Sequence, residues 1–301
     1  MPRRGFVRTA AALAAGFPFV ARGATQAEFK VGLVADAQYA DIPAKGTRFY
    51  RESVGKLGAA VEHFNGRDCA FCVHLGDLID RAWASFSAIE EPLRKSRPKW
   101  HQVLGNHDFD VLDAEKGQVP GRLGMIWRHG SFAHGGVRFV ILDTNDVSTY
   151  AHAAGSAEHA AAERELARIK AAKLPQAQNW NGGVGPAQLA WLEKTCRDAA
   201  TAGEKVVALG HHPIFPFGNH VAWNASEVLA ILARHRHVVA YLNGHNHAGA
   251  YGEHEGLQCV TMQGMVETAD TTAYATATVH ADRIVLTGAG REPSRELRFR
   301  R

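Results

Sequence analysis

Cysteine is scarce in this sequence, with four residues among 301, and the spacing of these residues matches no zinc ribbon. The one close pair, Cys69 and Cys72, falls in an apolar run that predicts a β-strand. Three residues of a strand span about 10 Å, which exceeds the roughly 7 Å Cα separation that a disulfide tolerates. We therefore expect no redox motif there, and we expect all four cysteines, Cys196 and Cys259 included, to be buried and unpaired.

An excess of charge of one sign is also missing. The chain has 34 lysines and arginines against 30 acidic residues, and Arg3, Arg4, Arg8 and Arg22 stand together near its start without an acid. Without these four arginines, the formal net charge of +4 falls to near zero. This balance excludes the overall basic character that nucleic acids or anionic membranes attract. The final basic run, REPSRELRFRR, is expected to be a solvated tail.

The first residues have the pattern of a secretory leader. The basic start PRRGFVRT precedes the apolar run AAALAAGFPFVA, and small residues follow. The apolar run is too short to span a bilayer and contains Pro18, which disfavours both a membrane anchor and an ordinary helix. The pattern predicts a twin-arginine-type leader over residues 1–24, cleaved between Gly23 and Gln26. It therefore predicts a bacterial protein that is periplasmic or secreted and has no membrane attachment after cleavage.

Residues 25–301 predict a single α/β domain, because short apolar runs alternate with amphipathic segments and neither repeats nor low-complexity linkers interrupt them. The chain closes with antiparallel strands around a turn at Ala281-Asp282. An Ala-rich, charged segment at about 150–180 is expected to form a helical surface insertion over one rim. Three further helices are predicted at 48–65, at 186–202 between Pro186 and Gly203, and at 226–236 with Ser226 as its cap.

Polar residues end several of the predicted strands. Strand ends of an α/β sheet converge on one crevice, and glycines beside the polar residues allow tight turns near an ion. Oxygen and imidazole donors brought together in this way predict a metal site. The candidates are Asp36 and Gln38 after the first strand, Asp77 in GDLID, Asn106 and His107 in GNHD, His211 in GHH, and His245 and His247 in GHNH.

The order Asp, GD, GNH, GH and GHxH resembles the calcineurin-like metallophosphoesterases from about Lys30 to the final strands. The resemblance implies an α/β fold in which two β-sheets form a sandwich flanked by helices, in four αββα layers. It also implies two divalent metal ions and hydrolysis of a phosphate ester or anhydride by metal-activated hydroxide. In that pattern Asp77 bridges the ions, Asp36, Gln38 and His247 complete the first site, and Asn106, His211 and His245 complete the second.

The resemblance also implies that His107 is the catalytic histidine, which protonates the leaving-group oxygen or stabilises charge in the transition state. Asp108 is expected to orient His107, with a plain turn-forming role equally open. The H-x-P spacing of the family favours His211 over His212 as the ligand. Four other histidines fall outside the pattern and are expected to be structural: His74, His101, His129 and His134.

Most of the superfamily has a histidine where this chain has Gln38, and an amide carbonyl is a harder donor than an imidazole. We therefore expect manganese, with magnesium, iron or zinc as alternatives. The stretches GLVADAQYAD, NGGVGPAQLAWL, GHNHAGAY and GMVET together resemble the manganese-dependent ADP-ribose/CDP-alcohol diphosphatase branch. That resemblance implies small-molecule substrates, namely nucleoside diphosphate conjugates whose diphosphate is hydrolysed.

The same metal site also suits a general phosphomonoesterase or phosphodiesterase. A purple acid phosphatase is disfavoured, because Asp80 stands where that family has its iron-binding tyrosine. A catalytically silent scaffold is disfavoured, because all eight positions of the pattern are filled. Several aromatic residues could stack a nucleobase, although such residues more often belong to the core: Phe49, Tyr50, Trp180 and Trp223.

Overall fold

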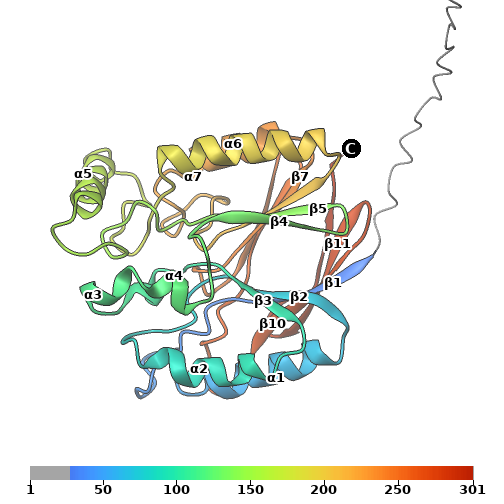
Figure 1. Ribbon diagram of the computed structural model, residues 1–301, viewed down its shortest axis with the longest axis horizontal. Coiled ribbons are helices and arrows are strands. Elements are labelled where there is room, and N and C mark those ends of the chain that lie inside the picture. Colours follow the sequence, from blue (N-terminus) through green and yellow to red (C-terminus); the bar gives the residue numbers. More distant parts are fainter. Residues whose placement is uncertain (1–27, 301) are drawn as a thin grey trace, which may run out of the picture.

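Two β-sheets of six strands each pack face to face between two outer layers of helices in the computed structural model, which describes residues 28–300 (Figure 1). The predicted αββα sandwich is therefore confirmed. The predicted leader at 1–24 lies outside the described residues. None of the helices in the described part of the chain has the length and hydropathy that crossing a membrane requires.

The first sheet has the strand order β12-β11-β10-β1-β2-β3. Its parallel strands are β1 (Phe29–Val34), β2 (Cys69–His74) and β3 (Lys99–Gln102), and its antiparallel strands are β10 (Ala273–Val279), β11 (Arg283–Gly290) and β12 (Arg295–Arg298). Parallel neighbours need long connections. These are α1 (Ser53–Asn65) and α2 (Ser85–Arg94), which cover the outer face of this sheet (Figure 1).

The second sheet has the order β4-β5-β6-β7-β9-β8. Its parallel strands are β5 (Val137–Ile141), β6 (Lys205–Leu209), β7 (Val238–Asn243) and β9 (Leu257–Thr261), and its antiparallel edges are β4 (Gly130–His134) and β8 (Ala250–His254). Helices α6 (Pro186–Thr201) and α7 (Ala225–Arg234) lie on its outer face (Figure 1).

The remaining helices lie at the end of the molecule toward which β1 runs (Figure 1). Between β3 and β4 these are η1 (His107–Phe109), α3 (Asp113–Lys116) and α4 (Val119–Arg122), and between β5 and β6 there is α5 (Ala157–Ala171). The hydroxyl of Ser156 accepts a hydrogen bond from the backbone of His159 and so caps α5.

The strands at the centre of each sheet are buried on both faces, which explains their nearly continuous apolar runs. In the first sheet, Leu33 and Val73 pack between the sheets, whereas Val34 and Cys72 pack against the helices. All four cysteines are buried and unpaired, as predicted.

Two predicted helix boundaries need correction. The helix predicted from residue 48 begins at Ser53, because the backbone of Phe49 donates a hydrogen bond to Val266 and thereby joins an extended segment. The helix that Ser226 was expected to cap begins at Ala225. Its N-cap residue is Asn224, whose side chain binds the backbone of Val184 instead of the helix.

The basic C-terminal tail is not solvated at Arg300, contrary to expectation. Its guanidinium nitrogens lie 2.5 to 3.2 Å from six backbone carbonyl oxygens, which share its five N–H groups. Five of these carbonyls lie around the end of α7 and the start of β7, and the sixth lies in the turn between β8 and β9. The last carbonyls of a helix have no partner within the helix. Arg300 supplies donors to those of α7 and thereby attaches the C-terminal segment to this helix. The acceptors are Leu232, Ala233, His235, Arg236, Val238 and Glu255.

Replacing Arg300 with alanine should lower the free energy of unfolding by about 1.5–3 kcal/mol, the range for hydrogen bonds to a charged group. Arg298 is a matched control, because its side chain is 75% exposed and pairs with Glu296 on the surface. Urea unfolding should show little change for Arg298→Ala. Equal stabilities of the two variants would contradict the anchoring role of Arg300.

Candidate metal centre

The structure brings all seven predicted metal ligands together at the carboxyl ends of five strands, β1, β2, β3, β6 and β7. Three of these strands belong to the first sheet and two to the second. Parallel strands carry their carboxyl ends to one edge of a sheet. The sandwich therefore presents donors from both sheets to a single place.

One group of donors gathers around Asn106. Its Oδ1 lies 2.9 Å from Nδ1 of His245 and 3.1 Å from Nε2 of His211. The same Nε2 of His211 lies 3.3 Å from Oδ2 of Asp77. The possible ligand atoms of Asp77, His211 and His245 all lie within 4.8 Å of one another, a spacing that one metal ion can bridge.

A second group lies beside the first and shares Asp77 with it. Oδ1 of Asp36 is 3.5 Å from Nε2 of His247, and the amide nitrogen of Gln38 donates to Oδ2 of Asp77 at 3.0 Å. The carbonyl oxygen of Gln38 is buried and has no hydrogen-bond partner among residues 28–300. A buried polar atom without a partner costs about 1–3 kcal/mol, and a cation would satisfy this one.

Each of the three ligand-candidate histidines binds an acceptor outside the cluster through its other ring nitrogen. An acceptor at the outer nitrogen fixes the N–H there and leaves the lone pair of the other nitrogen facing the cluster. The pairs are Nδ1 of His211 with the Leu75 carbonyl at 2.8 Å, Nε2 of His245 with Oδ1 of Asn181 at 2.8 Å, and Nδ1 of His247 with Oε1 of Glu267 at 2.7 Å. This arrangement fits metal binding.

Sequence reasoning missed Asn181 and Glu267. Both lie inside motifs that carried the family resemblance, NGGVGPAQLAWL and GMVET, which were the available signal. Their distance from the histidines along the chain, 64 and 20 residues, hid the contacts.

The backbone at the cluster adopts an uncommon conformation. Asp36, Gln38, Asp77 and His245 have positive φ values of 53°, 44°, 58° and 71°, in the region that residues other than glycine rarely occupy. Space is equally tight, because a Cβ added at Gly105 would lie 2.1 Å from the backbone nitrogen of Asp77. Such strain persists only where surrounding structure enforces it, and it is typical of functional sites.

The electrostatics of the cluster favour positive charge at His211, whereas burial and the neighbouring histidines hold the pKa of His245 well below its usual range. Burial disfavours the charged form of His211, but the carboxylates of Asp77 and Asp36 outweigh this effect and raise the pKa of His211 to about 9. Burial likewise opposes ionisation of Asp77, yet the nearby His211 and His107 hold its pKa well below its usual range. The donor set and its charge thus fit two divalent cations.

The expectation that Asp108 orients His107 is wrong. Nδ1 of His107 lies 2.8 Å from Oδ2 of Asp110 and 3.4 Å from Oδ1 of Asp80. Burial opposes the charged form of His107, but Asp77, Asp110 and Asp80 outweigh it and raise its pKa well above the usual range. The position that disfavoured a purple acid phosphatase, Asp80, therefore contacts His107 instead.

Asp108 has a different role, since its buried carboxylate accepts hydrogen bonds from four backbone N–H groups at 2.8 to 3.2 Å. Consecutive side chains of the short η1 turn point in different directions, so a neighbour in sequence need not be a neighbour in space. The donors belong to Asp77, Leu78, Ile79 and Gly105, which places Asp108 beneath the loops that carry Asp77 and Asn106.

The other histidines do not join the cluster as donors. His212 binds the hydroxyl of Thr144 through Nδ1 at 2.8 Å, and its ring packs against that of His245 at 4.3 Å. His74 is fully buried, and burial lowers its pKa to about 4, so it stays neutral. Three more contact aromatic rings away from the donors: His101, His129 and His134.

Of the aromatic residues considered for stacking, Tyr50 and Trp223 belong to the core, whereas Trp180 is 42% exposed. Trp180 directly precedes Asn181, whose side chain also binds the backbone of Asn219 at 2.7 Å. The ring of His220, in the same loop as Asn219, lies 5.7 Å from that of His245. The backbone carbonyl of Trp180 lies 3.4 Å from Nε2 of His212, so the chain at Trp180 passes close to the donors while its indole is partly exposed.

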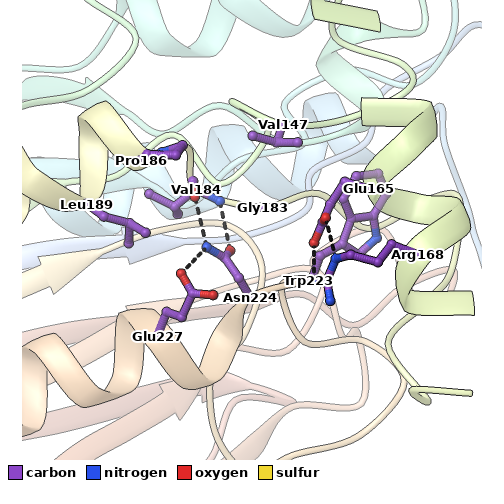
Figure 2. A pocket seen from close by; sticks show the side chains of 10 residues that line it. All are labelled: Val147, Glu165, Arg168, Gly183, Val184, Pro186, Leu189, Trp223, Asn224 and Glu227. Atoms are coloured by element: carbon purple, nitrogen blue, oxygen red, sulfur yellow. Dashed lines mark hydrogen bonds and ion pairs between the residues drawn. The ribbon is translucent and has the colours of Figure 1, made fainter. Parts of the chain in front are cut away.

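A separate cavity of about 320 Å³ lies between α5, α6 and α7, and Figure 2 shows that Trp223 forms part of its wall. Glu165 and Arg168 of α5 pair with each other at its edge. No predicted site residue lines this cavity.

Among characterised proteins, the chain is similar to manganese-dependent ADP-ribose/CDP-alcohol diphosphatases. It is 32% identical to that of Bos taurus, over 91% of this chain and 95% of the relative. It is 30% identical to that of Homo sapiens, over 91% and 93%, and 28% identical to that of Oryza sativa, over 90% and 94%.

The prediction of a bacterial periplasmic or secreted protein is wrong, because these relatives come from animals and plants. They lend no support to the twin-arginine leader on which that localisation depended. A basic start followed by a short apolar run is a pattern of composition, and it does not by itself establish export.

Among solved structures, a dimetal phosphatase from Danio rerio superposes with a TM-score of 0.83 at 28% identity, over 90% of this chain and 99% of that one. The family model for calcineurin-like phosphoesterases matches residues 29–249, a range that contains every predicted metal ligand. With the donors of both sheets gathered at one centre, the chain belongs to the calcineurin-like phosphoesterase family.

Proposed function

We propose that this metal-dependent phosphohydrolase hydrolyses the diphosphate bond of nucleoside diphosphate conjugates such as ADP-ribose or CDP-alcohols. The observation that carries the proposal is the convergence of seven oxygen and nitrogen donors around Asp77, in a chain about 30% identical to diphosphatases of that name over most of its length. The substrates are those named for the relatives.

The donor set suits two ions that share Asp77. Asp36, Gln38 and His247 would hold one ion with it, and Asn106, His211 and His245 would hold the other. When bound, the ions would lower the pKa of a water to about 7 and neutralise charge on the phosphate. The amide oxygen of Gln38 and the names of the relatives both favour manganese.

The part of His107 in the reaction is to move a proton. Its backbone N–H donates to Oδ1 of Asp77 at 2.8 Å, which holds the residue beside the centre. Because Asp110 and Asp80 bind Nδ1, the N–H at Nε2 is the one left to protonate the leaving-group oxygen. The side chain is 23% exposed, so a substrate can reach it.

Trp180 is the residue best suited to bind the nucleoside. Its indole is 42% exposed, and it directly precedes Asn181, whose side chain binds His245. Base stacking on an aromatic side chain is tolerant of base identity. That tolerance is compatible with substrates that carry either adenine or cytosine.

A substrate panel tests the proposal directly. Protein stripped of metal should be inactive and should regain activity with manganese. The reloaded enzyme should hydrolyse ADP-ribose and CDP-choline and leave a cyclic nucleotide and an aryl phosphate largely intact. Turnover of the aryl phosphate alone would instead indicate a phosphomonoesterase, and recovery only with zinc or iron would contradict the manganese preference.

Variants of the GNHD loop should separate catalysis from structure. His107→Ala should retain its metal and lower kcat by about 10²- to 10⁴-fold, the usual worth of general acid catalysis. Asp110→Ala should lower kcat less, because Asp80 still binds Nδ1 of His107. Asp108→Ala should instead lower the melting temperature, since four backbone N–H groups lose their acceptor. Full activity of His107→Ala would remove it from the mechanism.

Trp180→Ala should raise KM for ADP-ribose and CDP-choline by about 5- to 150-fold, since stacking is worth roughly 1–3 kcal/mol per base. Metal content should not change. Tyr251 is a suitable control, because it is 46% exposed and lies on the edge strand β8. If Trp180→Ala and Tyr251→Ala gave the same KM, Trp180 would not contact the nucleoside.

A further inference from the structure

The loop at residues 264–268 holds His247 from the side opposite the metal cluster. We propose that Glu267 positions His247 for metal binding, and that the buried Lys56 on α1 positions Glu267 by fixing this loop. The inference rests on the proposed function, because it takes His247 as a ligand. It concerns two residues that are not themselves donors to the ions.

The contact between Glu267 and His247 is short and sheltered. Oε1 of Glu267 lies 2.7 Å from Nδ1 of His247, and the two side chains are only 13% and 10% exposed. A carboxylate at Nδ1 keeps the proton on that nitrogen, so that Nε2, 3.5 Å from Asp36, carries the lone pair. The carboxylate of Glu267 thus decides both the tautomer and the direction of the ring.

Gly264 supports the same ring from another side. A Cβ added at Gly264 would lie 2.6 Å from Cγ of His247, so only glycine lets the loop approach this closely. The backbone N–H of Gly264 donates to the carbonyl of His247 at 3.2 Å. Together, the close packing of Gly264 and the hydrogen bond to Glu267 fix the orientation of the imidazole.

Lys56 holds the loop itself. Its ammonium contacts four consecutive carbonyl oxygens, those of Met265, Val266, Glu267 and Thr268, at 3.1, 3.4, 3.0 and 2.5 Å. Carbonyl dipoles that converge on one point repel each other unless a cation lies between them. Lys56 is buried, so water cannot take its place without rearrangement.

The opposite edge of the loop is hydrogen-bonded to the segment that directly follows β1. The backbone N–H groups of Met265 and Val266 donate to the carbonyls of Ala35 and Asp36 at 3.0 and 2.9 Å. The loop is therefore hydrogen-bonded on one side to the backbone of Asp36, a proposed ligand of the same ion as His247, and on the other side to Lys56. Through these contacts the loop links α1 to the metal centre.

Manganese binding tests the role of Glu267 without relying on turnover. Removing an outer partner of a ligating histidine typically weakens metal affinity by about 10- to 100-fold. Glu267→Ala should show this loss at one of two manganese sites in a competition titration with a chelating dye. Glu267→Gln should lose less, because its amide oxygen still accepts the N–H.

Glu193 on α6 offers a matched control, because its carboxylate also binds a histidine. Oε1 of Glu193 lies 3.2 Å from Nε2 of His235. Glu193→Gln should leave both manganese affinities unchanged. If the wild-type protein binds two manganese ions and Glu267→Ala binds them equally well, the positioning role is overturned and the proposed function stands. If the wild-type protein binds none, the proposed function fails and this inference fails with it.

The tautomer of His247 gives a second measurement. It would not change if Glu267 had only a structural role. In metal-free protein, imidazole ¹⁵N spectra should show His247 protonated at Nδ1, and Glu267→Ala should shift the proton toward Nε2. His247→Ala identifies the signal. An unchanged tautomer in Glu267→Ala would overturn the proposal.

The role of Lys56 is tested in the same way. Lys56→Met keeps the length of the side chain and removes the cation, so it should weaken the same manganese site as Glu267→Ala. Lys194, which is 67% exposed and pairs with Asp198, provides the control Lys194→Met. If Lys56→Met remains folded by circular dichroism with wild-type manganese affinity, the link from α1 to His247 is overturned. If it does not fold, the Glu267 variants still decide the positioning role of that residue.

Discussion

The burial of Asp36 and Asp77 is the constraint on which the centre depends, because no lysine or arginine among residues 28–300 forms an ion pair with either carboxylate. A buried carboxylate is costly unless it has hydrogen-bond donors and positive charge beside it. Asp77 instead contacts His211, and both His211 and His245 bind acceptors outside the cluster through their other ring nitrogen. Divalent cations would satisfy the carboxylates, the imidazole lone pairs and the amide oxygen of Gln38 together.

Much of the surrounding structure serves to bring these donors close. Positive φ values at four donor residues and a glycine pressed against Asp77 have a conformational cost that the two sheets offset by burial. Asp108 contributes by gathering four backbone N–H groups under the loops of Asp77 and Asn106. The fold thus holds four of the donors in an uncommon backbone conformation at the strand ends.

A layer of partners behind the donors completes the centre. The three imidazoles are oriented by hydrogen bonds to Leu75, Asn181 and Glu267. Lys56, on α1, in turn donates to the backbone carbonyl of Glu267. His107 has its own pair of carboxylates, Asp80 and Asp110. These contacts give each side chain one orientation, which is what preorganised catalysis and tight metal binding both require.

The sequence by itself predicted an α/β fold with candidate donors at the strand ends, because the strand pattern is local and these residues follow the strands directly in the chain. Its resemblance to a known family supplied the two-sheet sandwich and the proposed set of metal ligands. The sequence also determined that the cysteines would be buried. Only the tertiary structure decided that Asp110 and Asp80, rather than Asp108, hold His107, that Glu267 and Asn181 set the histidines, and that Arg300 is anchored. Most of these contacts join residues far apart in the chain. Even Asp108 and Asp110, which are two residues apart, point their side chains in different directions from one short turn, and no periodicity in the sequence predicts this difference.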